Sequence, residues 1–474
     1  MKRLLIDSSF FQTRIVLAQD DEPIEMFYES KKQKSIVGNI YAGRIVSVLK
    51  GMQACFVDIG EEKNAYLPLG GQKKIKANST MCVQVEKDAY GQKGAVLTDR
   101  ISFTGTYVVL IPNDKGFGIS KKITDQTERD RIFNIMQEIV PEGFGIIIRT
   151  EGFGKSREEF KKEIDELILS AEAVEKADFI KAPCLLRSDD DTVIRAIREL
   201  FTSDVDEMII NDTDYYDKAL KSIRQYPEKI KLYEQNIPLF EYYGVESKLE
   251  KLYQNKVWLK SGGFIIIEQT EACVVIDVNT GKFTGKKDIQ ETFLKTNLEA
   301  ADEIAHQMRL RNLSGIIIID FIDMKYRENR EILQKRLEND VKHDRIKTTV
   351  VGMTKLGLMQ ITRKKTSIPL LMQMSDGCLC CKGRGFVPSA EYTAGKVLRE
   401  IVSLFSSTLF RKVTVSSNKY IISALSVNNR AYINEIENKF DAKIVLKEID
   451  TAAFDYVDIE KSASEVKYST DKKN

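Results

Sequence analysis

Two apolar runs in the second half of the chain each lead to an aspartate. Residues 273–279 read CVVIDVN, and residues 315–320 read GIIIID. The end of the first run alternates between apolar and polar residues, so a strand would place Asp277 and Asn279 on one face and Ile276 and Val278 on the other. The unbroken isoleucines of the second run indicate a strand buried on both faces, with Asp320 at its C-terminal end.

The segment between these runs, residues 288–312, has the apolar spacing of an amphipathic helix. The positions that set this spacing are Ile289, Phe293, Ala301, Ile304 and Met308. Strand, helix and strand make a unit in which the two strands lie parallel, so both aspartates would emerge at one sheet edge. A single aspartate there is more often a turn former or a helix cap. Two carboxylates and an amide together favour a Mg²⁺ site.

The rest of the chain shows other patterns. Residues 1–35 alternate in short strands, and residues 36–99 form a second β-rich block whose closely spaced strands predict a small barrel. Residues 100–190 mix strands with charged helix, and residues 191–253 read as mostly helical. The part after the cysteine cluster near residue 380 reads as helix-rich.

Composition sets broad limits. A chain of 474 residues with 43% hydrophobic positions is long enough for about three or more folded units. It has no apolar run that could span a bilayer and no signal-peptide core, so we expect a cytoplasmic protein without a membrane partner. The net charge is only +2, so any nucleic-acid surface must be a local patch. With two histidines in the chain, mechanisms that need a histidine pair are disfavoured.

The β-rich block offers candidate contacts to nucleic acid. Alternation places Phe56 and Tyr66 on the solvent side of the predicted barrel, where aromatic rings can stack on bases. Lys87 and Lys93 lie nearby in the sequence and could neutralise phosphate. An exposed aromatic residue taken alone is more often plain surface, so this alternative stays open.

Residues 144–156, FGIIIRTEGFGKS, resemble a nucleotide-binding loop only in part. A Walker loop needs glycine where Arg149 stands, so this interpretation fails. Arg149 and Thr150 are either a solvated strand end or a phosphate clamp, because an arginine and a hydroxyl suit a phosphate.

Three of the seven cysteines cluster, and Cys378 and Cys381 have C-x-x-C spacing. Two thiolates are half of a structural zinc site, so either two chains share one zinc ion or the pair is redox-active. We expect the four scattered cysteines to be buried small hydrophobes. They are Cys55, Cys82, Cys184 and Cys273.

The stretch VWLKSGGFIIIEQTEACVVIDVNTGKF, followed by GIIIIDFIDM, resembles the catalytic core of the ribonuclease E/G family of endoribonucleases. The resemblance covers nearly the whole chain and is closest to the short ribonuclease G type. It implies a multidomain α/β and α+β fold, in which an OB-fold barrel is inserted in an RNase H-like subdomain. The implied parts are an RNase H-like subdomain in two pieces (1–35 and 191–253), the OB-fold RNA-binding domain (36–99), a 5′-sensor subdomain (100–190), a DNase I-like catalytic subdomain (254–374), a zinc link (375–386) and a small dimerisation domain (387–474).

The resemblance also implies roles for individual residues. The family's catalytic Mg²⁺ ligands match Asp277 and Asp320, with Asn279 assisting, and its RNA contacts match Phe56, Tyr66 and Lys93. Its sensor of the 5′-monophosphate matches Arg149 and Thr150, supported by backbone at Gly105 and Val109. Lys347 stands where a further sensor arginine is usual, which keeps the charge but loses the planar fork. Cys378 and Cys381 match cysteines that share Zn²⁺ between two protomers, while Cys380 is an additional thiol.

The expected function is Mg²⁺-dependent cleavage of single-stranded, A/U-rich RNA by water, which leaves 5′-phosphate and 3′-hydroxyl ends. Cleavage would serve rRNA or tRNA maturation or mRNA turnover and be favoured by a 5′-monophosphate. The partners implied are RNA and a second copy of the chain, with pairing of dimers left open, and no scaffold arm for a degradosome. The alternatives are a catalytically silent RNA-binding dimer and, from Asp7 in the first strand, an RNase H-like or actin-like ATPase that lacks the accompanying carboxylates.

Overall fold

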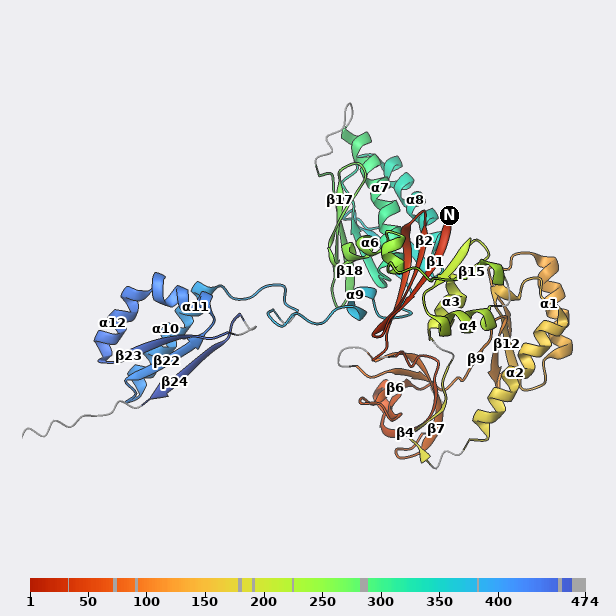
Figure 1. Ribbon diagram of the computed structural model, residues 1–474, viewed down its shortest axis with the longest axis horizontal. Helices are drawn as coiled ribbons and strands as arrows, with labels where there is room; N and C mark the ends of the chain where they lie inside the picture. Colours follow the sequence, from red (N-terminus) through yellow and green to blue (C-terminus); the bar gives the residue numbers. More distant parts are fainter. Residues whose placement is uncertain are drawn as a thin grey trace, which may run out of the picture. The chain divides into compact units, whose positions relative to one another are not determined.

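The computed structural model divides the chain into two compact units, Met1–Met374 and Ser375–Asn474 (Figure 1). The residues that the structure describes are 1–32, 34–70, 75–89, 93–177, 181–189, 192–223, 226–281, 289–381, 383–450 and 454–462. Within these ranges, no helix combines the length and the apolar character needed to cross a membrane.

The first sheet of the larger unit joins the start of the chain to residues 200 positions later. Its order is β15-β14-β1-β2-β3, and β14 pairs in parallel with β1. The strands are β1 (Lys2–Ser8), β2 (Gln12–Gln19), β3 (Glu22–Ser30), β14 (Glu207–Ile210) and β15 (Ile230–Leu232). Apolar side chains of α3 and α4 pack on one face of this sheet, and those of α5 and α6 pack on the other. These helices are α3 (Thr192–Leu200), α4 (Thr213–Ser222), α5 (Leu239–Tyr242) and α6 (Glu246–Glu250).

The prediction that residues 191–253 are mostly helical is therefore only partly correct. It identifies the helices but misses β14 and β15. All four residues of β14 are buried, because helices cover both faces of the sheet there. Such a strand lacks the alternation of polar and apolar positions by which an exposed strand is identified.

The predicted small barrel is confirmed. The barrel strands are β4 (Ile40–Leu49), β5 (Ala54–Asp58), β6 (Ala65–Pro68), β7 (Thr80–Lys87) and β8 (Val96–Thr98). Pairing of β4 with β7 closes the order β4-β5-β6-β8-β7, which gives an OB-like barrel of five strands. Cys55, Val57 and Leu67 fill its interior, as their alternation predicts. A further strand from outside the block, β13 (Cys184–Arg187), adds to β4.

The third sheet has the order β11-β12-β10-β9 and is covered by two helices. Its elements are β9 (Phe103–Thr104), β10 (Val108–Pro112), β11 (Phe117–Ile119), β12 (Phe144–Ile148), α1 (Gln126–Ile139) and α2 (Arg157–Glu175). Ser156 begins α2 with a capping box, in which Glu159 bonds back to the Ser156 N–H. The mixture of strands and charged helix predicted for residues 100–190 is thus confirmed.

The fourth sheet carries both aspartate-tipped strands. Its order is β16-β17-β18-β19-β21-β20, and β18 and β19 are parallel, as predicted. The elements are β16 (Lys256–Trp258), β17 (Phe264–Gln269), β18 (Cys273–Asn279), β19 (Gly315–Asp320), β20 (Thr348–Met353), β21 (Met359–Arg363), α7 (Ile289–Leu310) and α8 (Arg327–Asp340). The short α9 (Leu370–Gln373), which follows β21 in the chain, packs instead against the first sheet. Helix α7 is the predicted crossover, and it lies with α8 on one face of the sheet (Figure 1). Ile289, in its first turn, is exposed instead of buried.

One prediction about this sheet is wrong. The isoleucine run of β19 is buried on one face only, since Ile317 and Ile319 face the helices while Ile316 is 52% exposed. The run of isoleucines therefore does not mean that helices cover both faces of this strand. The sheet has an open face, and Asp277 and Asp320 are both exposed on it.

The smaller unit is helix-rich, as predicted, but it also contains a sheet that the sequence analysis missed. Its sheet has the order β23-β22-β24, in which β23 is parallel and β24 antiparallel to β22. The elements are α10 (Ala390–Ser407), β22 (Lys412–Ser417), α11 (Lys419–Ser423), a π-helical turn (Ala424–Asn428), α12 (Arg430–Phe440), β23 (Lys443–Glu448) and β24 (Val457–Ser462). The strands carry a weak sequence signal, because they are short and two of them have exposed, charged ends.

A buried ion pair holds the outer edge of the fourth sheet. Arg363 on β21 donates to Asp344 at 2.6 and 3.2 Å, and the two side chains are 3% and 2% exposed. Burial would raise the pKa of the Asp344 carboxyl, but bonds from Arg363, the Ile346 N–H and the Thr348 hydroxyl hold this pKa below its usual value. Arg363 also donates to the Leu313 carbonyl, so it ties β21 to the loop before β19.

We predict that Asp344→Asn lowers the free energy of unfolding by about 3–5 kcal/mol, because it leaves the Arg363 charge buried and uncompensated. Since the pKa of Asp344 is lower in the folded state, its contribution is complete above the unfolded-state pKa and is lost as the pH falls through the folded-state pKa. The variant should therefore lose less stability on acidification than the wild type. Urea unfolding at several pH values measures both effects.

The matched control is Glu331→Gln, which removes the exposed partner of Arg327 on α8. The side chains of Arg327 and Glu331 are 88% and 55% exposed, so this substitution should change the free energy of unfolding by less than about 0.5 kcal/mol. A loss under about 1 kcal/mol for Asp344→Asn would contradict the role given to the buried pair.

Candidate active site and nucleic-acid interface

The two aspartates lie side by side at the end of the parallel strands. Asp277 on β18 and Asp320 on β19 are direct register partners, and neighbouring strands are about 4.8 Å apart. Asn279 shares their face, and its side-chain amide donates to Asp277 Oδ2 at 2.7 Å. The structure thus brings together all three residues predicted for the metal site.

A buried asparagine positions the chain just after Asp320. Asn297 on α7 is fully buried, donates to the Ile322 carbonyl at 2.8 Å and accepts from the Ile322 N–H at 3.0 Å. These two bonds tie the crossover helix to the segment that follows β19. The sequence analysis missed Asn297. A signal was present, since this polar residue lies on the apolar face of the predicted helix.

Two glycines allow close packing at the other end of the site. A Cβ on Gly263 would lie 2.8 Å from the Asn279 carbonyl oxygen, and one on Gly281 would lie 2.4 Å from the Gly262 carbonyl oxygen. Gly281 also has φ of +59°, which glycine adopts without strain. The turn before β17 therefore packs directly on the end of β18, which places β17 beside the aspartates.

The donor set at this edge fits a hard divalent cation. Among the described residues, neither Asp277 nor Asp320 forms an ion pair, and both carboxylates face solvent. Two carboxylates and one amide oxygen suit Mg²⁺, which keeps several waters in its shell. Over the same ranges no group of three or more His, Cys, Asp or Glu side chains has metal-site geometry, so a closed cage made by these residues alone is not present.

The barrel carries a row of side chains across its outer face. Register pairs run from Ser47 to Phe56, then to Tyr66, Val96 and Lys87. The Phe56 and Tyr66 rings meet edge to face, with centroids 6.2 Å apart, and both are half-buried. Lys87 is exposed at the end of this row. Such a row of two rings and a cation can bind a nucleobase and its phosphate.

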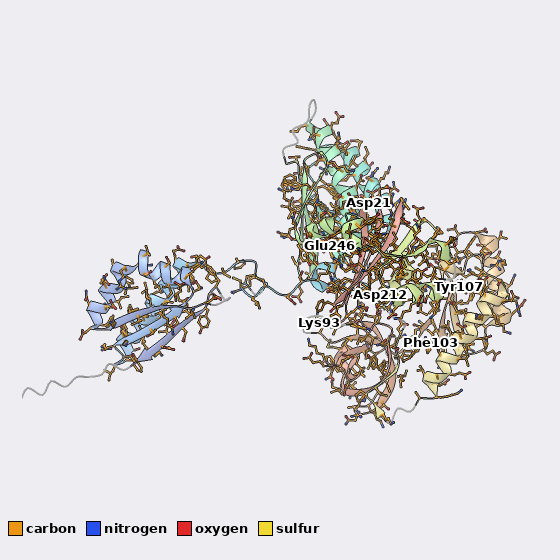
Figure 2. All side chains as sticks on the ribbon, in the orientation of Figure 1. Asp21, Lys93, Phe103, Tyr107, Asp212 and Glu246 are labelled. Atoms are coloured by element: carbon orange, nitrogen blue, oxygen red, sulfur yellow. The ribbon has the colours of Figure 1, made fainter. Side chains whose placement is uncertain are left out.

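Lys93 lies apart from that row. It is exposed at one end of the barrel, just before β8 (Figure 2). The barrel therefore presents one predicted lysine in line with the aromatic pair and one at its rim.

The Arg149–Thr150 pair follows β12 and faces the loop before β10. Arg149 Nη1 donates to the Gly105 carbonyl at 2.7 Å, and the Thr150 hydroxyl lies 3.0 Å from the Ser120 hydroxyl. Val109 lies in β10, in register with Thr104 and Ile147. Arginine, two hydroxyls and a loop backbone thus converge, which is a suitable composition for a phosphate site.

A glutamate that the sequence analysis missed fixes this loop. Glu163 on α2 accepts from the backbone N–H groups of Thr106, Tyr107 and Val108 at 2.6, 2.8 and 3.0 Å. A Cβ on Gly105 would lie 2.6 Å from the Glu163 carboxyl carbon, so a larger residue there would displace the carboxylate from these three N–H groups. Nothing in the sequence separates Glu163 from the many other charged residues of its helix.

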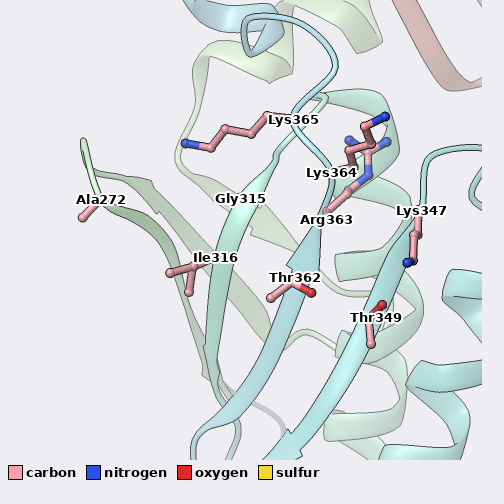
Figure 3. Close-up of a pocket in the computed structure, with 9 residues that line it drawn as sticks. All are labelled: Ala272, Gly315, Ile316, Lys347, Thr349, Thr362, Arg363, Lys364 and Lys365. Atoms are coloured by element: carbon pink, nitrogen blue, oxygen red, sulfur yellow. The ribbon is translucent and has the colours of Figure 1, made fainter. Parts of the chain in front are cut away.

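Lys347 lies elsewhere. It lines an open hollow at the far edge of the fourth sheet, together with Thr349, Thr362, Lys364 and Lys365 (Figure 3). In the part of the chain that the structure describes, no hydrogen bond or ion pair joins Lys347 to Arg149 or Thr150. The predicted sensor set is thus brought together except for Lys347.

The two spaced cysteines lie in a glycine-rich turn of the smaller unit. The Gly385 N–H, followed by the Cys378 thiol and the Gly383 N–H, lowers the pKa of the Cys381 thiol. Gly383 and Gly385 have φ of +84° and +79°, which lets their N–H groups point at the sulfur. Thiolate stabilisation of this kind suits a metal ligand.

The scattered cysteines only partly follow expectation. Cys55 is buried in the barrel, as predicted, whereas Cys82, Cys184 and Cys273 are partly exposed. Burial still raises the pKa of the Cys82 thiol to about 11, which makes it a poor nucleophile.

Comparisons with known proteins bear on these sites. The model of the ribonuclease E/G family matches residues 102–366, and the model of the RNase E/G thioredoxin-like domain matches residues 377–462. Ribonuclease G of Haemophilus influenzae is 35% identical over 458 residues, which cover 91% of this chain and 92% of that protein. Ribonuclease G of Escherichia coli K12 is 33% identical over 460 residues, which cover 92% and 94%.

Ribonuclease E of Haemophilus influenzae is 34% identical over 472 residues, and the matched region covers 94% of this chain but only 50% of that longer protein. The family model alone matches more than half of the present chain and includes Asp277, Asn279 and Asp320. The chain belongs to the ribonuclease E/G family.

Proposed function

We propose that this protein is a Mg²⁺-dependent endoribonuclease that cleaves single-stranded, A/U-rich RNA and leaves 5′-phosphate and 3′-hydroxyl ends. That it is an endoribonuclease, and so a hydrolase, follows from its family and from its similarity to ribonuclease G over nearly the whole chain. The observation that carries the proposed chemistry is the register pairing of Asp277 with Asp320 on an open sheet face. The cellular role proposed with it is rRNA or tRNA maturation or mRNA turnover.

In the proposed mechanism, Asp277 and Asp320 would hold the ion, and the Asn279 amide, which donates to Asp277 Oδ2, would orient that carboxylate. Bound Mg²⁺ would supply a Lewis acid that neutralises charge on the scissile phosphate. The open face lets a flexible strand lie across the two carboxylates without a lid. Duplex RNA would expose its bases to stacking residues less readily, which supports a preference for single strands.

Water is favoured over the 2′-hydroxyl as the attacking group. Attack by the 2′-hydroxyl usually needs a general acid and base, commonly two histidines. His306 is on α7, where its Nε2 lies 2.7 Å from the Pro23 carbonyl, and α7 packs on the other face of the sheet. His343 follows α8, also away from the aspartates. The chain therefore offers no histidine pair for that route.

The barrel would hold the RNA near the site. Phe56 and Tyr66 would each contribute about 1–3 kcal/mol by stacking on bases, and Lys87 and Lys93 would neutralise phosphates. Because the two rings are adjacent in strand register and in contact, they could bind neighbouring bases of one strand.

A 5′-monophosphate would bind at Arg149, Thr150 and the loop at Gly105, with Val109 in the adjoining strand. Lys347 lies in a different hollow and lacks the arginine fork, so we propose that it contributes weakly to this recognition.

The smaller unit would form a homodimer through Zn²⁺ shared by Cys378 and Cys381 of two chains. The lowered pKa of Cys381 supports thiolate ligation, and two cysteines per chain make a complete set of four only when two chains combine. Pairing of two such dimers stays a prediction.

We predict that Asp320→Asn reduces cleavage of a short A/U-rich RNA at least about 100-fold, because one of two anionic ligands is lost. RNA binding measured without Mg²⁺ should be unchanged. The control Glu268→Gln changes another exposed carboxylate of the same sheet face and should alter the rate by less than about threefold. If the wild type binds the RNA but never cuts it, a silent RNA-binding dimer becomes the better account.

We predict that Arg149→Ala removes the preference for a 5′-monophosphate over a 5′-hydroxyl, since it deletes the main cation of the proposed site. The ratio of cleavage rates on two RNAs that differ only at the 5′ end measures this preference. Arg157→Ala, which removes an arginine paired with Glu138 on the surface, should leave the ratio unchanged. An Arg149→Ala enzyme that keeps the wild-type ratio would show that the pocket is not the sensor.

We predict about one zinc ion per two chains in the purified protein, and its loss together with the dimer in Cys378→Ser and Cys381→Ser. Metal analysis and sedimentation measure the two properties. Cys380→Ser is the matched control and should retain both. Loss of zinc in the control, with retention in Cys378→Ser, would assign the ligand to Cys380 instead.

A further inference from the structure

An exposed aromatic pair lies on the open face of the fourth sheet, beside the aspartates. Trp258 on β16 is the single tryptophan of the chain and is 61% exposed. Its ring meets the Phe264 ring of β17 edge to face, with centroids 5.4 Å apart. Exposing so large an apolar side chain has a cost in free energy, and an aromatic cluster at the surface is typical of a binding site.

A lysine accompanies this pair. The Lys256 ammonium lies 4.0 Å from the Trp258 ring centroid and 3.6 Å from that of Phe264. These are cation–π distances, so the three side chains form one small cluster that holds a positive charge at the surface. The cluster therefore presents ring surface for a base and an ammonium group for a phosphate.

The strand register relates this cluster to the catalytic residues. Trp258 pairs with Phe264, and Phe264 pairs with Asn279. The next row along the same face runs from Lys256 through Ile266 and Asp277 to Asp320.

With strands about 4.8 Å apart, Trp258 lies two strands, or about 10 Å, from Asn279. The close packing at Gly263 and Gly281 fixes this arrangement, because it joins the turn before β17 to the end of β18.

We propose that Trp258 and Phe264 are a stacking platform for an unpaired nucleobase of the RNA, next to the scissile phosphate. Lys256 neutralises a phosphate of the same strand. The inference rests on the proposed function, since it takes RNA as the ligand of this sheet face.

Charge favours RNA over a second copy of the chain as the occupant. Lys256 and the proposed metal ion at the two aspartates would both attract the phosphates of an RNA strand, and the two rings would contact its planar bases. Since every base has a π-face, the platform positions the strand and does not select its sequence.

The single tryptophan allows a direct test. The full chain, with Mg²⁺ removed by a chelator, is titrated with an oligouridine and with an abasic ribose-phosphate oligomer of equal length. We expect the oligouridine to quench tryptophan fluorescence and the abasic oligomer to leave it nearly unchanged. Equal responses to both ligands would overturn base stacking at Trp258.

Kinetics supply the second measurement. Trp258→Ala should raise KM for a short RNA about 5-fold to 150-fold, the loss expected for one stacked base. Trp258→Phe, which keeps a ring, should remain within about threefold of the wild type. Phe10→Ala, which removes an exposed ring from the β1–β2 turn, is the control and should have no effect.

The outcomes separate this inference from the proposed function. If the wild type cleaves RNA, Asp320→Asn does not, and Trp258→Ala matches the wild type, the platform alone is wrong. If the wild type does not cleave RNA, the proposed function fails first. A third outcome would overturn the proposal in favour of a second copy of the chain. In that case the tryptophan fluorescence of the wild type changes with protein concentration and not with RNA, and Trp258→Ala changes the sedimentation coefficient.

Discussion

The parallel register of β18 and β19 is the constraint on which the candidate site depends. Val274 and Ile276 on one strand, and Ile317 and Ile319 on the other, are buried against α7 and α8. Because strand side chains alternate, burying these residues forces Asp277 and Asp320 onto the opposite face. A shift of one residue in the pairing of either strand would turn its aspartate toward the apolar side chains of the helices. Burying an unpaired charge there has a large cost in free energy, so this register is not stable. The same core that stabilises the sheet therefore sets the spacing of the two carboxylates.

Covering the sheet on one side only makes the other side available for binding. The open face carries the Trp258–Phe264 pair near one edge, the aspartates on the middle strands and the lysines around Lys347 toward the other edge. This arrangement also explains why β19 exposes Ile316, since a second helical layer would shield the isoleucines and block the carboxylates. The proposed function would thus account for a hydrophobic exposure that stability alone would not favour.

Sequence reasoning succeeded where local alternation or spacing determines structure. The barrel, the βαβ unit and the pairing of Asp277 with Asn279 all follow from positions two or three to four residues apart. It failed for β14, whose four residues are all buried and show no alternation. It also failed for β19, because an unbroken run of isoleucines does not show that one face of the strand is exposed. Asn297 and Glu163 were missed because their roles come from partners 25 and more than 50 residues away in the sequence. Contacts of that range depend on how the sheets are assembled, which the spacing of residues along the chain does not reveal.

The larger unit keeps its proposed binding and catalytic groups on separate cores. The barrel, the sheet that carries Arg149 and the sheet that carries Asp277 each have their own cluster of buried apolar residues. Ile40 and Cys82 of the barrel strands pack in the cluster of the sheet that carries Arg149, so these two regions share partners. The core of the sheet that carries Asp277 contains no residue of either, so changes there should combine with changes in the other two almost additively in free energy. Trp258 and Asp320 differ in this respect, because both lie on one sheet and are coupled through β17 and β18. Positioning of the RNA and cleavage would then depend on each other at this sheet, while the barrel and the 5′ pocket would mainly change how tightly the strand is held.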